Sequence, residues 1–198
     1  MVSTNVKTYF FDNDHLEDII TVLNSGGVVV YPTDTIWGVG CDACNAAAVE
    51  KVYALKKRSR DKGFVILVDS IEMLKKYVAH VHPRVDTLLH YHERPLTVVF
   101  DQARNLPANV CPPDGSIGVR IVKDEFCRLL IRHFGRPLVS SSANVSNESF
   151  QGTFGSISSE ILTGADYVVK YRQHEKFCGP PSVIVKALEN GELEFLRT

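Results

Sequence analysis

The sequence predicts an α/β protein built on a mixed β-sheet, and two observations carry this prediction. Short apolar segments alternate along the chain with segments whose apolar residues recur at helical spacing, as they do in α/β layers. Near the end of the chain, Asn190 and Gly191 form a hairpin signal that adds an antiparallel edge. With 198 residues, 44% of them hydrophobic, the chain can bury about 70% of its unfolded surface. We therefore expect one domain over residues 1–198.

The predicted helices begin and end at recognisable signals. Asn13 can cap a helix whose apolar residues recur at helical spacing up to Leu23, and Gly26 with Gly27 can end it. Asn45 can cap a second helix that runs to residue 57. Further helices are predicted over residues 70–77, 83–90 and 124–134.

The predicted strands are short apolar runs. They cover residues 28–31, 64–68, 96–100, 117–122, 138–141, 167–170, 182–188 and 193–197. Pro32 ends the first strand, so residues 33–35 must form a turn that carries two hydroxyls and a carboxylate. Residues 144–158 are rich in Ser, Gly and Asn and are predicted to form a surface loop.

The composition limits the compartment and the partners of the protein. Its 22 basic and 23 acidic side chains give a formal charge of -1, which disfavours a global attraction to nucleic acid or membranes. No run of 18 apolar residues and no basic-then-apolar start are found, so we expect a cytoplasmic protein without a membrane partner. Five cysteines fit reduced thiols, and Cys41 with Cys44 lacks the second pair that a structural zinc requires. We expect no metal held by the protein itself.

Two weaker patterns are better explained by structure than by a site. Residues 38–43 match a loose dinucleotide-binding pattern, but Pro32 has already ended the strand and the next helix begins only after Asn45. The histidines between residues 80 and 92 lie in a charged stretch without a carboxylate or thiol cluster at ligand spacing, which favours a solvated face.

More informative are polar side chains at the ends of apolar strands. Three serines, at positions 140–142, and then Asn144 follow a predicted strand at its carboxyl end, the edge at which α/β sheets bind ligands. Basic residues gather between positions 56 and 62, and Arg120 lies alone within an apolar strand. A buried charge needs a partner, and an anionic ligand such as a phosphate or carboxylate would supply one.

Together these residues resemble the YrdC-like threonylcarbamoyl-AMP synthases. The resemblance extends from about residue 16 to residue 197 in family order, and its most specific part is the combination of Lys56 and Arg58 with Ser142 and Asn144. The matching stretches are residues 31–35, 38–40, 55–58, 61–62, 95–97, 118–120, 137–144 and 181–185.

The resemblance implies a twisted, largely open sheet with a positively charged concave site. It also implies that L-threonine, bicarbonate and ATP react there, with Mg²⁺ accompanying the nucleotide, to give threonylcarbamoyl-AMP and pyrophosphate. Tight binding of a metal by the protein is not implied. The product would pass to partner proteins that modify adenosine in tRNA, and tRNA or double-stranded RNA is a further possible partner.

Carried over position by position, the resemblance assigns roles to individual side chains. The expected catalytic group is Lys56, Arg58, Ser142 and Asn144. The expected ATP-binding residues are Arg58, Lys62, Ser116, Ser142 and Arg197. The expected threonine-binding residues are Thr35, Arg120, Ser140 and Ser182, which suit a small hydroxy amino acid because they combine hydroxyls with one guanidinium.

The sequence departs from the family pattern in two loops. Glu93 and Arg94 stand where the family usually has Pro-Gly, and Ser59 replaces a common proline. Two alternatives therefore stay open: a double-stranded RNA or tRNA-binding protein that uses the same basic concavity, and a paralogue of the same fold without the synthase activity. Retention of the Lys56, Arg58, Ser142 and Asn144 set favours the enzyme.

Overall fold

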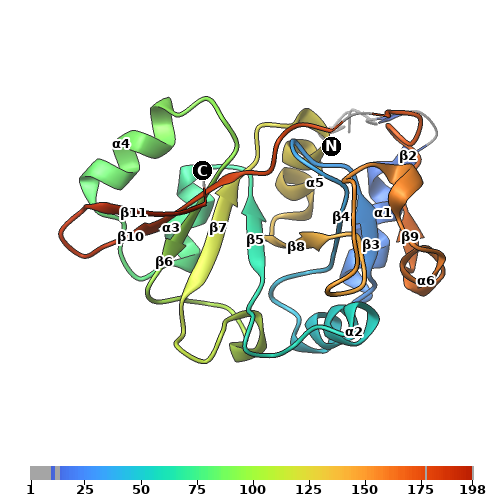
Figure 1. Cartoon of the computed structure of the whole chain (residues 1–198), viewed down its shortest axis with the longest axis horizontal. Helices are drawn as coiled ribbons and strands as arrows, with labels where there is room; N and C mark the ends of the chain where they lie inside the picture. The colour runs from blue at the N-terminus through green and yellow to red at the C-terminus, as the bar shows by residue number, and fades with distance from the viewer. Residues whose placement is uncertain (1–9, 12–13, 177, 198) are drawn as a thin grey trace, which may run out of the picture.

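A computed structural model describes residues 10–11, 14–176 and 178–197 and contains one large sheet (Figure 1). Its strands are β3 (Val29–Tyr31), β4 (Gly38–Gly40), β5 (Val65–Val68), β6 (Leu96–Phe100), β7 (Ile117–Ile121), β8 (Leu138–Ser142), β9 (Tyr167–Val168), β10 (Val183–Ala187) and β11 (Leu193–Arg197). They lie in the order β11-β10-β6-β7-β5-β8-β4-β3-β9. Two short strands, β1 (Phe10–Phe11) and β2 (Asp14–His15), pair separately.

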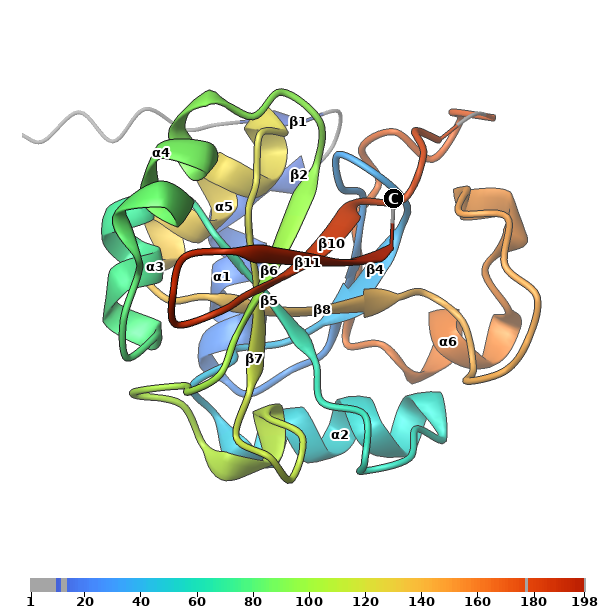
Figure 2. The same cartoon turned by 60° about the vertical axis from the view of Figure 1, so that its left-hand side comes forward.

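The helices are unevenly distributed about the sheet. They are α1 (Leu16–Asn24), α2 (Ala46–Lys56), α3 (Ile71–Tyr77), α4 (Pro83–Tyr91), α5 (Glu125–Phe134) and α6 (Ser159–Gly164), with short 3₁₀ turns at Ala108–Val110 and Phe154–Ser156. Figure 2 shows α1, α3, α4 and α5 together on one side of the sheet and α6 on the other. One side of the sheet is therefore much less covered by helices.

The helix boundaries follow local sequence signals. Asn45 caps α2, as predicted, because its side chain accepts a hydrogen bond from the amide of Ala48 at 3.1 Å. Helix α1 begins after His15, which provides no side-chain cap, and the predicted cap Asn13 lies outside the described residues. The helix α6 was not predicted, because its six residues are too few to show a helical period.

Strand pairing in the sheet differs from the prediction of a single antiparallel edge. The pairs β10–β11, β6–β7, β5–β8, β4–β8 and β3–β4 are all antiparallel, whereas β6–β10, β5–β7 and β3–β9 are parallel. Much of the difference comes from β4, which was not predicted. This glycine-rich strand lies between β3 and β8, so the chain turns back within the sheet.

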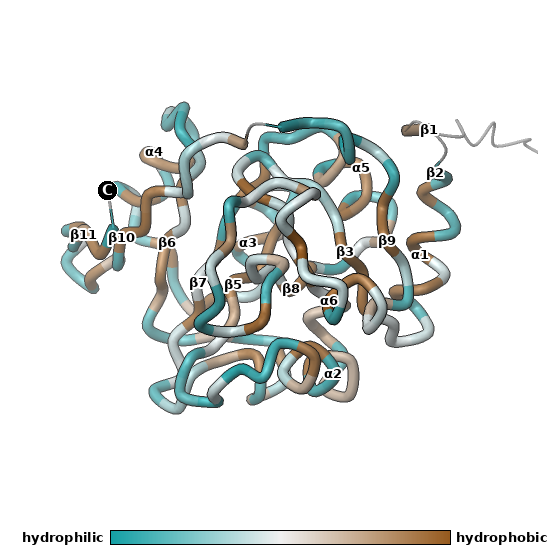
Figure 3. The backbone as a smooth tube through the Cα atoms, turned by 45° about the vertical axis from the view of Figure 1, so that its right-hand side comes forward, coloured by the Kyte–Doolittle hydropathy of each residue, from teal (hydrophilic) through white to brown (hydrophobic). Residues whose placement is uncertain are grey.

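The core lies between the sheet and the helices of its covered side. Figure 3 shows hydrophobic segments along the central strands and hydrophilic segments in the outer loops. On α5, Phe126, Leu130 and Phe134 recur every four residues and are buried. Ile66 and Val119 at the centre of the sheet are completely buried, and each such side chain contributes about 1.5–3 kcal/mol of transfer free energy.

The register of the central strands brings polar and small side chains onto one face. Ser140 on β8 lies opposite Val65 on β5, and Val65 lies opposite Gly118 on β7. Arg120, two residues after Gly118, lies opposite Thr97 on β6. Because directly opposite residues share a face and side chains alternate along a strand, these residues belong to the same face of the sheet.

Candidate functional site

An open cleft of about 230 Å³ lies over this polar face. Strands β4, β5, β6, β7, β8 and β10 contribute to it, together with the loop after β3, the segment after α2 and the end of β11. Its lining residues are Thr33, Thr35, Ile36, Gly38, Arg58, Gly63, Val65, Thr97, Arg120, Ser140, Ser141, Ser142, Pro181, Ser182, Ile184 and Arg197. Hydroxyls and three arginines thus dominate the polar lining.

The loop after β3 is fixed by its own hydroxyl groups. Thr33 Oγ1 donates to the carbonyl of Ile36 at 2.7 Å and accepts from the amide of Thr35 at 3.1 Å. Outside the cleft, the thiol of Cys127 on α5 donates to the carbonyl of Pro32 at 3.1 Å. The side chain of Thr35 is consequently held at the cleft wall before any ligand binds.

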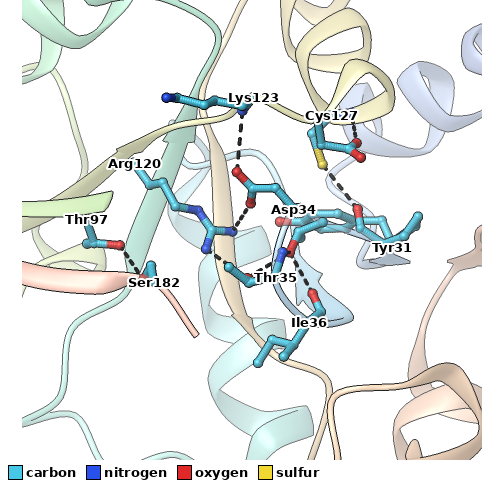
Figure 4. A network of polar contacts seen from close by, with 12 residues as sticks. Tyr31, Asp34, Thr35, Ile36, Thr97, Arg120, Lys123, Cys127 and Ser182 are labelled. Carbon is cyan, nitrogen blue, oxygen red and sulfur yellow. Dashed lines mark hydrogen bonds and ion pairs between the residues drawn. The ribbon is translucent and has the colours of Figure 1, made fainter. Parts of the chain in front are cut away.

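Arg120 already has a partner within the chain, whereas the sequence argument expected an anionic ligand to supply one. Its Nη2 lies 3.3 Å from Oδ1 of Asp34, and its Nη1 donates to Thr35 Oγ1 at 3.0 Å (Figure 4). The side chains of Arg120 and Asp34 are only 8% and 10% exposed. Asp34 is 86 residues away in sequence, so no local sequence pattern indicates this pairing.

A second polar group joins β6, β10 and β11. Thr97 Oγ1 lies 2.9 Å from Ser182 Oγ, a contact that Figure 4 also draws. Arg197 donates to the carbonyl of Ser182 from Nε at 3.0 Å and from Nη2 at 2.8 Å. Burial lowers the pKa of Arg197, and the nearby charge of Arg120 lowers it further. Arg120 and Arg197 thus line the same cleft, close enough for their charges to interact.

Arg58 lies at the cleft and also supports the segment that follows α2. Its Nε donates to the carbonyl of Lys62 at 2.9 Å and its Nη2 to that of Gly63 at 2.6 Å. The guanidinium also lies 4.9 Å from the ring centroid of Phe64, and burial lowers the pKa of Arg58. The guanidinium is therefore held in place by the chain, with its remaining donors available to a ligand.

Lys56 lies against the carboxyl end of β8 and does not line the cleft. The residue is 1% exposed, and its ammonium donates to the carbonyls of Ser142 and Asn144. Burial, followed by the charge of Arg58, lowers the pKa of Lys56 to about 8. Lys56 therefore supports the carboxyl end of β8.

Three further residues of the predicted site also lie outside the lining. Asn144 donates its side-chain amide to the carbonyls of Val145 and Glu148 at 2.9 and 3.0 Å. Ser116 is buried and donates to Asp114 at 2.7 Å. Lys62 is exposed at the end of the segment that Arg58 holds. The cleft thus brings together Thr35, Arg58, Arg120, Ser140, Ser142, Ser182 and Arg197 of the predicted set.

The cleft also contains hydroxyls to which the sequence argument assigned no role. Thr33, Thr97 and Ser141 line it, and Asp34 lies directly behind Arg120. Thr97 carried the same signal as Arg120, a polar side chain in an otherwise apolar strand, and this signal could have identified it.

The side chains that line the cleft suit a metal cation only when the cation enters together with a bound ligand. The lining contains hydroxyls but no carboxylate, whereas Mg²⁺ prefers carboxylates and phosphates. Within the part of the chain that the structure describes, no group of three or more His, Cys, Asp or Glu side chains could hold a metal ion. None of the helices described is long and apolar enough to cross a membrane.

Comparisons with known proteins agree with this fold. The chain is 31% identical over 161 residues to a threonylcarbamoyl-AMP synthase of Pseudoalteromonas translucida, covering 80% of this chain and 86% of that protein. A synthase of Coxiella burnetii is 30% identical over 134 residues, covering 67% and 72%.

Solved structures show the same architecture. P. abyssi Sua5 in complex with L-threonine has a TM-score of 0.83 at 22% identity, covering 92% of this chain but 53% of that one, so this chain spans about half of that protein. E. coli YciO has a TM-score of 0.77 at 19% identity, covering 92% and 87%. The family model named Sua5_yciO_yrdC, described as "Telomere recombination", matches residues 21–198. The chain therefore belongs to the Sua5/YciO/YrdC family.

Proposed function

We propose that this protein is a threonylcarbamoyl-AMP synthase, which forms threonylcarbamoyl-AMP and pyrophosphate from L-threonine, bicarbonate and ATP. The observation that carries the proposal is a single cleft lined by many hydroxyls, by one buried guanidinium and by two further arginines. Relatives about 30% identical to this chain carry the name of that enzyme.

The hydroxyl-rich wall fits a small hydroxy amino acid. Arg120 would bind the carboxylate of threonine, since its Nε has no hydrogen-bond partner among the described residues. Thr35, Ser140 and Ser182 would surround the rest of the substrate and offer partners to its hydroxyl. Gly38 lies between these groups, and its lack of a side chain leaves room for a ligand.

The arginines of the cleft would bind ATP. Arg58 and Arg197 can fork onto phosphate oxygens, and Ser142 lines the same cleft. Lys62 and Ser116 would extend this part of the site. Lys56 and Asn144 would act indirectly, because both bind main-chain carbonyls at or just after the carboxyl end of β8.

The proposed chemistry depends on position and electrostatics. The amine of threonine and bicarbonate form a carbamate with loss of water, and a carbamate oxygen then attacks the α-phosphorus and displaces pyrophosphate. The negative charge that grows on the phosphates would be stabilised by Arg58, which main-chain carbonyls already hold in place. Mg²⁺ would enter as part of the substrate MgATP and partly neutralise the leaving pyrophosphate.

The product has a further destination in this proposal. Threonylcarbamoyl-AMP would pass to partner proteins that modify tRNA, and the reaction would take place in the cytoplasm in a single domain. Direct binding of tRNA would serve this transfer.

Measuring pyrophosphate release from MgATP tests the proposed function. We expect release to require both L-threonine and bicarbonate. Serine should be the best wrong substrate, because one methyl contributes only about 1–3 kcal/mol, whereas valine would leave hydroxyl partners unpaired and be rejected more strongly. Equal turnover of threonine and valine, or release without bicarbonate, would contradict the proposal.

A further inference from the structure

The three arginines of the cleft differ in how their charges are compensated. Arg120 forms an ion pair with Asp34. Within the described residues, Arg58 and Arg197 form no ion pair, and the hydrogen bonds seen for them go to neutral carbonyl and hydroxyl groups. The charge of Arg120 is therefore compensated by a carboxylate of the chain, whereas the charges of Arg58 and Arg197 are not.

This division matches the charges of two kinds of ligand. A polyphosphate needs uncompensated cations, whereas an amino acid near pH 7 is a zwitterion with no net charge. A buried guanidinium that is already neutralised gains little from an anion, because the anion also meets the carboxylate behind the guanidinium. A zwitterion brings an ammonium group that offsets this repulsion.

We propose that Asp34 is a specificity-determining residue, which neutralises the charge of Arg120 so that its subsite accepts a zwitterionic amino acid and rejects simple hydroxy-carboxylate anions. The inference rests on the proposed function, because it assigns threonine to that subsite. Asp34 does not line the cleft, so it acts through its charge and through the orientation it gives to Arg120.

The surroundings hold Asp34 in this arrangement. Its second oxygen, Oδ2, accepts from the amide of Lys123 at 3.4 Å (Figure 4), while Oδ1 faces Arg120 as an ion pair without hydrogen-bond geometry. Thr35, the residue after Asp34, accepts a hydrogen bond from the same guanidinium. The backbone of this loop thus brings the carboxylate of Asp34 and the hydroxyl of Thr35 to the same guanidinium, that of Arg120.

Calorimetric titration of the whole protein with L-threonine and with 3-hydroxybutyrate, which lacks the amino group of threonine, tests this proposal. The wild-type protein should bind threonine at least about tenfold more tightly than 3-hydroxybutyrate. In Asp34→Asn, which keeps an acceptor oxygen but removes the charge, this ratio should fall about tenfold. Asp34→Glu should retain the wild-type preference.

A matched control is available in Asp42. This side chain is 7% exposed and pairs with Arg136 at 2.9 Å, outside the cleft lining. Asp42→Asn should leave the ratio of the two affinities unchanged. An unchanged ratio in Asp34→Asn, or an equal fall in both variants, would overturn the proposal.

The wild-type titration can overturn the role proposed for Asp34 even if Asp34→Asn does not fold. Tight binding of 3-hydroxybutyrate, equal to that of threonine, would overturn the role of Asp34, and so would the absence of threonine binding. Threonine binding with the expected preference but without pyrophosphate release would instead support the charge selection and refute the proposed function. The two failures are therefore distinguishable.

Discussion

At the scale of single residues, the cations of the cleft also bind groups of the chain itself. Arg58 binds two main-chain carbonyls of the segment after α2 and packs near Phe64. Arg58 follows α2, which already buries Val49, Val52 and Tyr53. The structure shows that its guanidinium also orders residues 62–63.

Replacing Arg58 by alanine should therefore affect both activity and stability. Turnover should fall by about 10²- to 10³-fold, the usual effect of deleting one preorganised donor. The free energy of unfolding should fall by about 1–2 kcal/mol, because two carbonyls lose their partner. Lysine should restore turnover only in part, since a point charge cannot form a bidentate contact. Steady-state kinetics and urea unfolding on the same purified variants measure both effects.

Arg132 provides the control for this prediction. It is an exposed arginine on α5 that pairs with Asp69 outside the cleft. Arg132→Ala should leave turnover unchanged and cost at most about 1 kcal/mol of stability. Normal turnover in Arg58→Ala would end the catalytic role proposed for Arg58.

The types of residue in the site were predictable from sequence, but their partners were not. The apolar surroundings of Arg120 and the serines after residue 139 marked a site. Arg120 and Asp34 meet only because β7 and the loop after β3 come together in the fold. Lys56 binds main-chain carbonyls, which every residue carries, so no sequence pattern could have indicated that contact.

At the scale of elements, sequence reasoning identified the apolar strands but missed strand β4. Short apolar runs such as residues 96–100 were predicted correctly, because β-branched and aromatic residues favour a strand there. β4 was missed because two of its three residues are glycines, which are depleted in strands. The structure shows why Gly40 is required: a Cβ there would lie 1.7 Å from the carbonyl oxygen of Val139.

Gly40→Ala should consequently separate β4 from β8. We expect a loss of about 3 kcal/mol in the free energy of unfolding, since the contact is with backbone that cannot turn aside. Gly155→Ala is the matched control, because a Cβ at that glycine meets nothing within 4 Å. Urea unfolding of both variants tests this, and equal stability of the two would contradict the packing argument.

At the scale of the whole molecule, the predicted α/β class with a mixed, open sheet is confirmed, and the strand order gives the cleft its composition. Seven strands contribute lining residues: β8 contributes three, and β4, β5, β6, β7, β10 and β11 contribute one each. Sequence periodicity identified most of these strands. It could not predict their order or direction, because these depend on which apolar faces pack best together.

The burial that forms this core also makes stability depend on pH. Burial raises the pKa of the thiols of Cys41, Cys44, Cys111 and Cys127, and it raises the pKa of Tyr31. In the unfolded chain the thiols lose their protons near pH 8.5, whereas the folded chain keeps them. The folded state then binds more protons, so the free energy of unfolding falls as pH rises above about 8.5.

Lys56 acts in the opposite direction. Its pKa is lowered to about 8 in the folded state, mainly by burial, so above that pH the unfolded chain binds the extra proton and stability rises. One lysine opposes four thiols, and a net fall should remain between pH 9 and 10. Cys127→Ala should make this fall shallower by up to about 1.4 kcal/mol per pH unit, because one fully buried thiol no longer retains its proton. Urea unfolding in the presence of a reductant, repeated at several pH values, measures both slopes. If the wild-type and Cys127→Ala slopes coincide, proton retention by this thiol does not contribute to the alkaline loss of stability.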